Sequence, residues 1–262
     1  MVFAIIGAVV VGVTLGLLGS GGSILTVPVL VYLVHRPDKN AIVESLAIVG
    51  VIALSGALTR VKKREIDFGA AGLFALASIP GAWIGGEIGS RIPGALQLVI
   101  LAATMLVSAA LMLRGKSKKR PADDGKDAPG KRRHPLIVIP VGLGVGMLTG
   151  TAGVGGGFLF VPALTVAAGL DIRRAIGTSL LLISINCATS FYKYLAHRGA
   201  LEEPIDWMTI AIFGVVGVAG ALVGQRLGSR ISREMLRKIF AVFLVVLGVY
   251  MLWRETMSLM GR

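Results

Sequence analysis

The chain is poor in the residues on which most enzymes depend. Among 262 residues it has one cysteine and three histidines, and only 16% of its residues are charged. The single Cys187 excludes an intramolecular disulfide, leaves the redox compartment unreadable and fits a small buried side chain. His35, His134 and His197 lie in or beside loops, and no group of His, Cys or acidic residues has metal-site spacing. We therefore expect no catalytic residues, no metal and no cofactor.

Apolar residues, in contrast, are in excess. They make up 55% of the chain, and the mean hydropathy is +0.81. This is more apolar surface than the interior of a globular protein of this size can hide, so lipid must cover the rest. The net charge of +13 comes from residues in short loops between apolar runs, where membrane proteins carry their orientation signals. We expect a bilayer as the environment and no nucleic-acid partner.

The apolar residues form two sets of five stretches, which predicts an all-α, polytopic membrane protein. Between the sets lies a polar segment rich in basic residues, Pro and Gly, Arg114 to His134, which is typical of an exposed linker. This divides the chain into a first membrane repeat (1–113), a linker (114–135) and a second membrane repeat (136–262). The stretches are 2–18, 24–34, 41–59, 68–88 and 95–113, then 136–152, 158–170, 175–195, 206–225 and 235–253.

The two sets are copies of one unit. The pattern Gly-x-x-x-Gly-x-x-Gly-x-Gly-Gly-x-x-x-x-Val-Pro occurs at Gly12 to Pro28 and again at Gly146 to Pro162. The same register aligns Ala41 to Leu46 with Ala175 to Leu180, and after a short insertion it aligns Ile66 to Phe68 with Ile205 to Trp207. Because the first stretch has an internal counterpart, we read it as structure and not as a signal peptide.

Segment length separates spanning from non-spanning pieces. The second stretch of each copy reaches only about 17 to 20 Å, whereas the hydrocarbon layer is about 30 Å thick. A short helix after a glycine-rich break is typical of a hairpin that turns inside the membrane. Each copy would then be one hairpin plus three spanning helices, and the two copies would be inverted repeats. In this topology most of the 27 Lys and Arg residues lie on the side of the linker, which we predict to be cytoplasmic, with both termini outside.

The glycine breaks are the first candidate for a binding site. In an inverted repeat the two hairpin tips can approach each other near mid-membrane, and the N–H groups that open the following short helices suit an anion. The alternative is that these glycines only permit close helix packing. The candidate substrate-binding residues here are Gly19, Ser20, Gly21, Gly22 and Ser23, with Gly153, Val154, Gly155, Gly156 and Gly157.

Polar residues on spanning stretches are the second candidate, because they are expensive in lipid. Ser45, Thr178, Ser179 and Asn186 are candidates to complete the coordination of an anion, and hydrogen bonds to a neighbouring turn are the alternative for the hydroxyls. Glu44 occupies the position that Thr178 has in the other copy, and it is our candidate for proton coupling.

Regularly spaced glycines predict helix packing, within one subunit or between the subunits of a homodimer. They are Gly81, Gly85 and Gly89 in the first copy and Gly220, Gly224 and Gly228 in the second.

These motifs resemble the sulfite exporter TauE/SafE family of bacterial membrane transporters. The paired Gly-x-Gly-Gly-x-x-x-x-Val-Pro segments are followed by Ala-Ile-Gly-Thr-Ser-Leu at Ala175 to Leu180, which is degenerate as Ala-Ile-Val-Glu-Ser-Leu at Ala41 to Leu46. The resemblance covers nearly the whole chain except the linker. It implies transport of sulfite, sulfoacetate or related organosulfur anions across the cytoplasmic (inner) membrane, often outward. Glu44 departs from the Thr of the family pattern, which leaves open whether both halves bind substrate alike.

We therefore expect a multi-pass secondary transporter that exports a small sulfur-containing anion by alternating access. Transport of another small anion, such as a carboxylate, is an alternative. A membrane-embedded hydrolase with Ser20 or Ser23 as nucleophile is a weaker one, because no base lies at that depth, and an assembly factor without transport is another.

Overall fold

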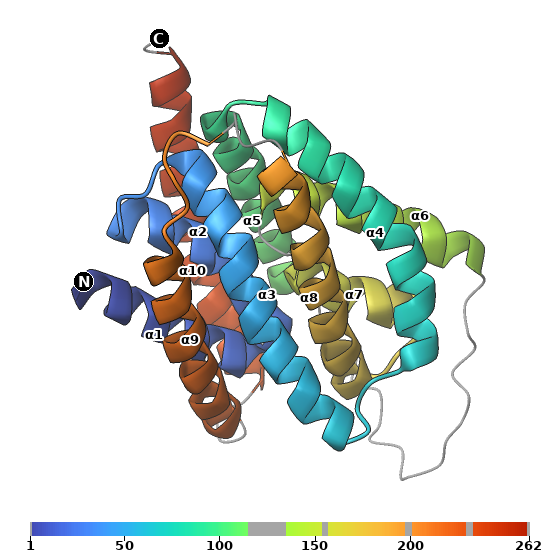
Figure 1. The fold of residues 1–262 in the computed structure, drawn as a ribbon. Helices are drawn as coiled ribbons and strands as arrows, with labels where there is room; N and C mark the ends of the chain where they lie inside the picture. The colour runs from blue at the N-terminus through green and yellow to red at the C-terminus, as the bar shows by residue number, and fades with distance from the viewer. Residues whose placement is uncertain (1, 115–134, 154–156, 197–200, 229–232, 261–262) are drawn as a thin grey trace.

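The structure is a computed structural model that describes residues 2–260 except 115–134, 154–156, 197–200 and 229–232 (Figure 1). Regular structure in these residues is helical, and each of the ten apolar stretches coincides with a helical segment. The first copy comprises α1 (Val2–Leu18), the 3-10 segment η1 (Gly19–Leu25), α2 (Thr26–Pro28), the π-helical turn η2 (Val29–Leu33), α3 (Asp38–Lys62), α4 (Phe68–Arg91) and α5 (Gly94–Arg114). The second comprises α6 (Pro135–Ala152), α7 (Gly157–Ala167), α8 (Ile172–Ala196), α9 (Trp207–Gly228) and α10 (Arg233–Met260).

Aspartate side chains cap three of the long helices at their N-termini. Asp67 accepts a hydrogen bond from the N–H of Ala70 in α4, and Asp171 accepts one from the N–H of Arg174 in α8. Asp206 accepts from the N–H groups of Met208 and Thr209 in α9. Such caps satisfy amide groups that the first turn of a helix leaves without partners, so they fix where these helices begin.

The first short helix is one arm of a hairpin. A Cβ atom on Gly22 would overlap the backbone of Leu15, and one on Gly7 would lie 3.2 Å from Leu33 Cδ2. The segment from Gly22 to Leu33 thus runs back along α1, and α3 starts at the end of the molecule where the chain began. The glycine break that we expected at Gly19 to Ser23 is a tight 3-10 turn.

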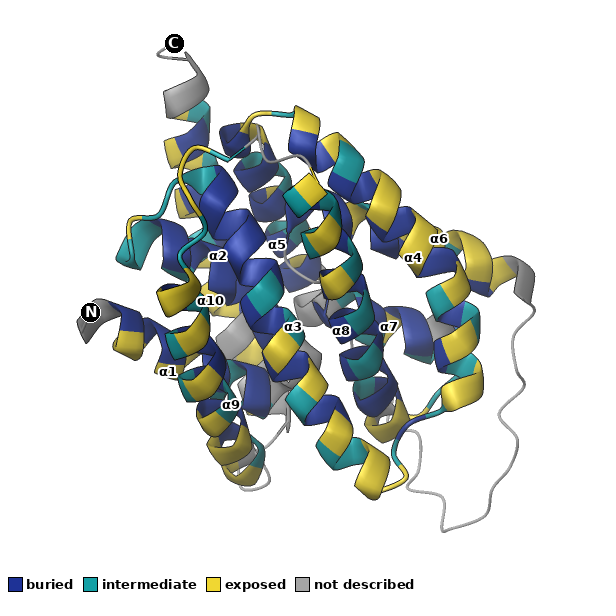
Figure 2. Cartoon of the chain, viewed as in Figure 1, coloured by how far each residue is buried: buried dark blue, intermediate teal, exposed yellow. Residues whose placement is uncertain are grey.

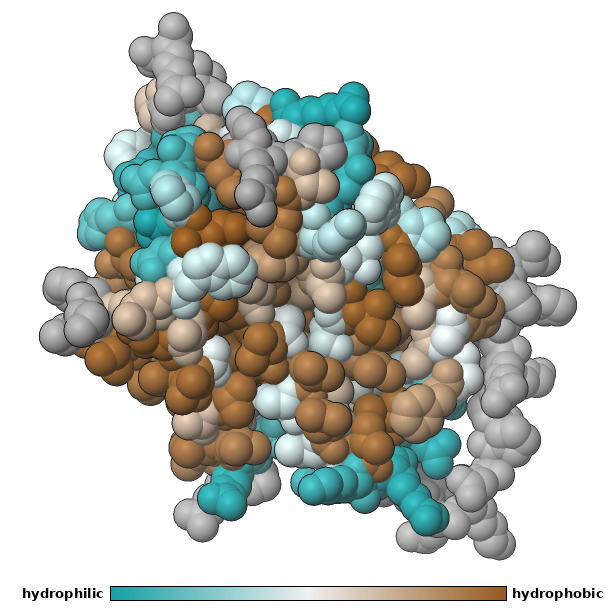
Figure 3. Space-filling view, in the orientation of Figure 1, coloured by the Kyte–Doolittle hydropathy of each residue, from teal (hydrophilic) through white to brown (hydrophobic). Residues whose placement is uncertain are grey.

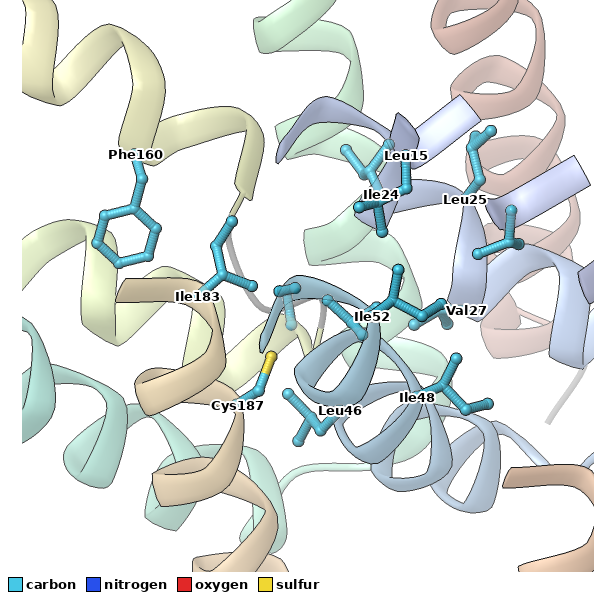
Figure 4. Packing of buried hydrophobic residues seen from close by; sticks show 14 of the residues in the cluster. Leu15, Ile24, Leu25, Val27, Leu46, Ile48, Ile52, Phe160, Ile183 and Cys187 are labelled. Atoms are coloured by element: carbon cyan, nitrogen blue, oxygen red, sulfur yellow. The ribbon is translucent and has the colours of Figure 1, made fainter. Parts of the chain in front are cut away.

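Two antiparallel helices, α3 and α8, form the centre of the molecule. A Cβ on Gly50 would lie 3.2 Å from Cys187 Cβ, and one on Gly56 would lie 3.2 Å from Leu180 Cδ1. The most apolar windows of α3 and α8 are 67% and 61% buried, against 39% for α4 and α9 (Figure 2). Figure 4 shows this core, in which Leu46 and Ile52 of α3 lie near Cys187 of α8.

Each copy packs one of its helices on the other copy in the same way. α1 crosses α9, and α6 crosses α4. A Cβ on Gly12 would overlap the carbonyl of Gly217, and a Cβ on Gly146 would overlap the carbonyl of Ser78, at the equivalent pair of positions. Four of the spaced glycines act in these crossings, since Gly81 and Gly85 meet the backbone of α6, and Gly220 and Gly224 meet that of α1. Gly89 instead faces Tyr194 of α8. The packing role that we expected for them therefore lies within one chain.

The described loops lie at two opposite ends of the molecule. We call one the Glu44 end, with residues 34–37, 92–93 and 201–206, and the other the Thr178 end, with residues 63–67 and 168–171. Polar side chains gather at both ends, and apolar side chains cover the surface between them (Figure 3). Within the described residues, four helices are long and apolar enough to cross a membrane, namely α3, α4, α8 and α9. α5 and α10, which we also expected to span, are not among these four.

Candidate functional site

The first glycine break packs against the second copy. η1 contacts both α7 and α8, so the first break reaches the short helix that follows the second. Gly22, Ser23 and Gly157 are buried, and Gly157 is the first residue of α7. Gly19, Ser20 and Gly21 belong to η1. Of the sequence-predicted site residues, Val154, Gly155 and Gly156 lie outside the described residues.

Gly153 is where the second break begins. Its φ of +68° is in the left-handed region, which side chains other than glycine rarely adopt, and a Cβ here would overlap Ile42 Cγ2. Ser45 Oγ lies 2.6 Å from the carbonyl oxygen of Gly153 and 2.8 Å from that of Ile42 in its own helix. The start of α3 in the first copy therefore holds the glycine break of the second.

The other predicted hydroxyls have different partners. Ser179 Oγ donates to the carbonyl of Ile176, one turn back in its own helix, at 2.9 Å. Thr178 Oγ1 accepts a hydrogen bond of 3.0 Å from the backbone N–H of Asp67, in the loop between α3 and α4. Both side chains are buried. Their hydrogen bonds are of the structural kind that we gave as the alternative to a binding role.

Glu44 is buried in an ion pair. Its side chain has 0% relative exposure and accepts two hydrogen bonds from Arg36, Nη2 to Oε1 at 2.6 Å and Nε to Oε2 at 3.1 Å. The backbone N–H of Asp206 also donates to Glu44 Oε1, at 3.0 Å. Burial lowers the pKa of Arg36, but the hydrogen bonds and charge of Glu44 outweigh it and leave that pKa above its ordinary value. Hydrogen bonds from Thr209 hold the pKa of Asp206 below its ordinary value, although partial burial opposes them.

Asn186 has a polar atom without a partner near the centre of α8. Its Nδ2 donates to Ser78 Oγ at 3.0 Å and to the carbonyl of Leu182 at 2.8 Å, but its buried Oδ1 has no hydrogen-bond partner. A buried amide oxygen without a donor is costly, so Oδ1 is available to accept a hydrogen bond from a bound group or a water molecule. The equivalent pair in the other half is Ile52 and Gly217, which are apolar and in contact. The fold therefore does not require a polar pair at this position.

Further polar groups continue from Asn186 along the same face of α8. Ser190 lies one turn on and faces the carbonyl of Ala82, and Tyr194 lies a further turn on. Gln97 Nε2 donates to Tyr194 Oη at 2.6 Å and to the carbonyl of Thr151 at 2.7 Å, while its own buried Oε1 has no partner. These residues connect the middle of the molecule with the Glu44 end.

Sequence reasoning missed Ser78, Gln97 and Arg36. It also missed Asn40, whose Nδ2 donates to the carbonyl of Glu203 at 2.7 Å. Ser78 was recoverable by comparing the copies, since Gly217 stands at its equivalent position, as Ile52 does for Asn186. Arg36 was recoverable in the same way, since Leu170 stands at its equivalent position, but the sequence does not show which groups Arg36 and Gln97 bind.

Charged side chains near the membrane surface pair with one another. Lys193 forms an ion pair with Glu87 and lies 4.4 Å from the ring centroid of Trp83. Glu87 also pairs with Arg91 in the next turn. Among the described residues no group of His, Cys and acidic side chains has the arrangement of a metal site.

An open depression lies at the Glu44 end. It has a volume of about 490 Å³ and is lined by Leu195 of α8, Trp207 of α9 and residues 201–205 between them. Its polar lining includes Glu202 and Glu203, so its charge suits a cation better than an anion. We do not include it in the candidate anion site.

Comparison with known proteins agrees with the glycine motifs. The family model described as sulfite exporter TauE/SafE matches residues 4–251. The chain belongs to this family. Probable membrane transporter proteins are among its relatives: one from Xylella fastidiosa (strain 9a5c) is 32% identical over 260 residues, covering 96% of this chain and 94% of the relative. YunE from Bacillus subtilis (strain 168) is 24% identical over 280 residues, covering 98% and 99%. No solved structure matches the chain.

Membership of TauE/SafE, together with the four apolar helices, makes this a multi-pass membrane protein of a transporter family.

Proposed function

We propose that the protein is a secondary transporter that exports a small sulfur-containing anion, such as sulfite, sulfoacetate or a related organosulfonate, by alternating access. The observation that carries the proposal is the contact between Ser45 and Gly153, which joins the two copies at a glycine break. We assign the protein no catalytic activity.

Inverted repeats are part of this proposal. The hairpin returns α3 to the end where α1 began, so each copy would make an odd number of crossings. The antiparallel α3 and α8 and the reciprocal crossings of α1 with α9 and α4 with α6 support a two-fold relation between the copies. Basic residues such as Lys62, Lys63 and Arg64 gather in the loop at the Thr178 end, which favours that end as cytoplasmic. The membrane would be the bacterial inner membrane.

The anion site would lie between the glycine breaks. Residues 19–23 and 153–157 would offer backbone N–H groups, and the positive end of α7 would favour negative charge. Ser45 and Ser179 would add hydroxyl groups to this site as the halves move. Asn186 and Ser78 would add a polar pair on one side of the site, because the equivalent pair in the other half is apolar. The Oδ1 atom of Asn186 would accept a hydrogen bond from a protonated oxygen of the anion or from a water molecule bound to it.

A thermal-shift screen on the purified full-length protein tests binding directly, because a ligand stabilises the state that binds it. Sulfite, sulfoacetate and acetate are compared at equal ionic strength. Ser45→Ala should remove most of the sulfite-dependent shift in Tm. Ser55→Ala is the matched control, since Ser55 also lies on α3 and bonds to a carbonyl one turn back, at 2.7 Å, but does not touch a glycine break. An equal shift with acetate would favour a carboxylate transporter instead.

A further inference from the structure

Three residues of the first copy hold one loop of the second copy at the Glu44 end. Asn40 and Glu44 are one turn apart on one face at the start of α3, and Arg36 lies in the loop just before this helix. Together they bind residues 202–206, between α8 and α9. We call this set of contacts the Glu44 clamp.

Each residue of the Glu44 clamp makes a direct contact across the two copies. Arg36 donates to Glu203 Oε2 at 2.7 Å and to the carbonyl of Pro204 at 3.1 Å. Asn40 donates to the carbonyl of Glu203 at 2.7 Å and accepts from the N–H groups of Glu202 and Glu203 at 3.2 Å. Glu44 accepts from the N–H of Asp206, as described above. The loop is therefore fixed mainly through its backbone.

The opposite end has the equivalent contact without the charges. There Thr178 takes the place of Glu44, and Asp67 takes the place of Asp206, with the same backbone N–H as donor. Leu170 stands where Arg36 stands in the first copy. Arg60 and Glu65 also form an ion pair at that end, but both belong to the first copy, whereas the Arg36–Glu44 pair takes part in the contact with the second copy.

We infer that the Glu44 clamp is a gate, which closes the transport path at the Glu44 end and makes that end open less readily than the Thr178 end. This inference rests on the proposed transport function, because rocking of the copies would have to break contacts between them at one end at a time. Separating Arg36 from Glu44 exposes two buried charges to water or leaves one of them without a partner, so the clamp favours two discrete states, closed and open.

Single cysteines test the gate at both ends. In a Cys187→Ala background, Ser45→Cys reports on the Glu44 end and Ser179→Cys, at the equivalent position, reports on the Thr178 end. The full-length protein in nanodiscs is treated with a cationic, membrane-impermeant methanethiosulfonate, and the labelling rate is measured. This measurement needs no transported anion.

Arg36→Gln and Glu44→Gln should each raise the labelling rate at Ser45→Cys by about tenfold or more and leave that at Ser179→Cys within about twofold. Glu203→Gln is the matched control, because it also removes a carboxylate partner of Arg36, but one that is 51% exposed. It should change the rate less than about twofold, since exposed ion pairs contribute little. Thr178→Val should raise labelling at Ser179→Cys instead.

Hydrogen exchange gives a second measurement, which can be interpreted even when a variant is partly destabilised. Amides of residues 202–206 should exchange faster in Glu44→Gln, while those of residues 63–67 at the other end keep their rate.

The inference is overturned if both Arg36→Gln and Glu44→Gln leave the labelling at Ser45→Cys unchanged. It is also overturned if labelling rises equally at both cysteines, because that indicates general loosening. Failure of every sulfur anion to bind or move, with the labelling pattern as expected, would instead reject the proposed substrate.

Discussion

Glu44 and Thr178 occupy the same position in the two copies, and each accepts a hydrogen bond from the backbone N–H of an equivalent aspartate in the other copy. The two bonds have the same length, 3.0 Å. Only Glu44 carries a charge, and it is balanced by Arg36. One frame thus appears at both ends of the molecule, and at the Glu44 end an ion pair takes part in it, whereas the Arg60–Glu65 pair at the Thr178 end lies within the first copy.

Close packing between copies should depend on glycine at the crossings. Gly85→Ala places a methyl group against the carbonyl of Met147, and we expect a loss of about 1 to 3 kcal/mol of stability from the forced separation of α4 and α6. Gly72→Ala is the control, because nothing lies within 4 Å of its Cβ position in the same helix. It should be neutral or stabilise by up to about 1 kcal/mol through helix propensity. Thermal unfolding in detergent compares them, and equal Tm values would contradict the packing.

The left-handed conformation of Gly153 should be needed for binding as well as stability. Gly153→Ala costs about 1 to 2 kcal/mol in backbone strain, and its methyl group also overlaps Ile42. Gly169→Ala shares the strain, at a φ of +73°, but lies away from the glycine breaks. Both variants should lower Tm, and only Gly153→Ala should lose the sulfite-dependent shift. Retention of the full shift would place the site elsewhere.

The polar pair of Asn186 and Ser78 can be replaced by the apolar pair that the other half uses. In the double variant Asn186→Ile/Ser78→Gly the side chains become those of Ile52 and Gly217, so we expect the fold and Tm to be kept or improved, since an unpaired buried oxygen is removed. Sulfite transport should fall about tenfold, in line with the loss of one hydrogen bond to a ligand. Unchanged transport would assign the pair a structural role.

Topology can be tested at two equivalent loop positions. Lys63 and Glu202 align between the copies, and both are exposed. In a Cys187→Ala background, Lys63→Cys and Glu202→Cys should label from opposite sides of sealed vesicles if the repeats are inverted. Parallel repeats would put both on the same side, so labelling of both cysteines from one side rejects the inverted arrangement.

Segment positions were predictable from the sequence because apolar length and glycine breaks are local features. The short stretch after Gly22 also predicted a hairpin, and in the first copy this segment runs back along α1. That each hairpin turns inside a membrane stays a prediction. The partners of polar residues were not. Asn40 meets Glu203 and Gln97 meets Tyr194 only after the two copies interlock, and no periodic pattern marks such pairs.

Glu44 is a second case in which the sequence did not give the partners of a polar residue. The sequence marked it as an asymmetry between the copies and a candidate for proton coupling, and the structure shows that it is buried against Arg36. Its second partner, the backbone N–H of Asp206, belongs to the loop between α8 and α9. This loop meets the start of α3 only through tertiary packing.

The most direct test of the account is flux through the reconstituted protein. Proteoliposomes preloaded with unlabelled sulfite and placed in dilute radiolabelled sulfite should accumulate label by counterflow. Sulfoacetate should compete better than acetate, and Ser45→Ala should reduce the rate about tenfold while Ser55→Ala leaves it unchanged. Accumulation no greater than in protein-free liposomes, for sulfite and for sulfoacetate alike, would contradict the claim that this protein transports a small sulfur-containing anion.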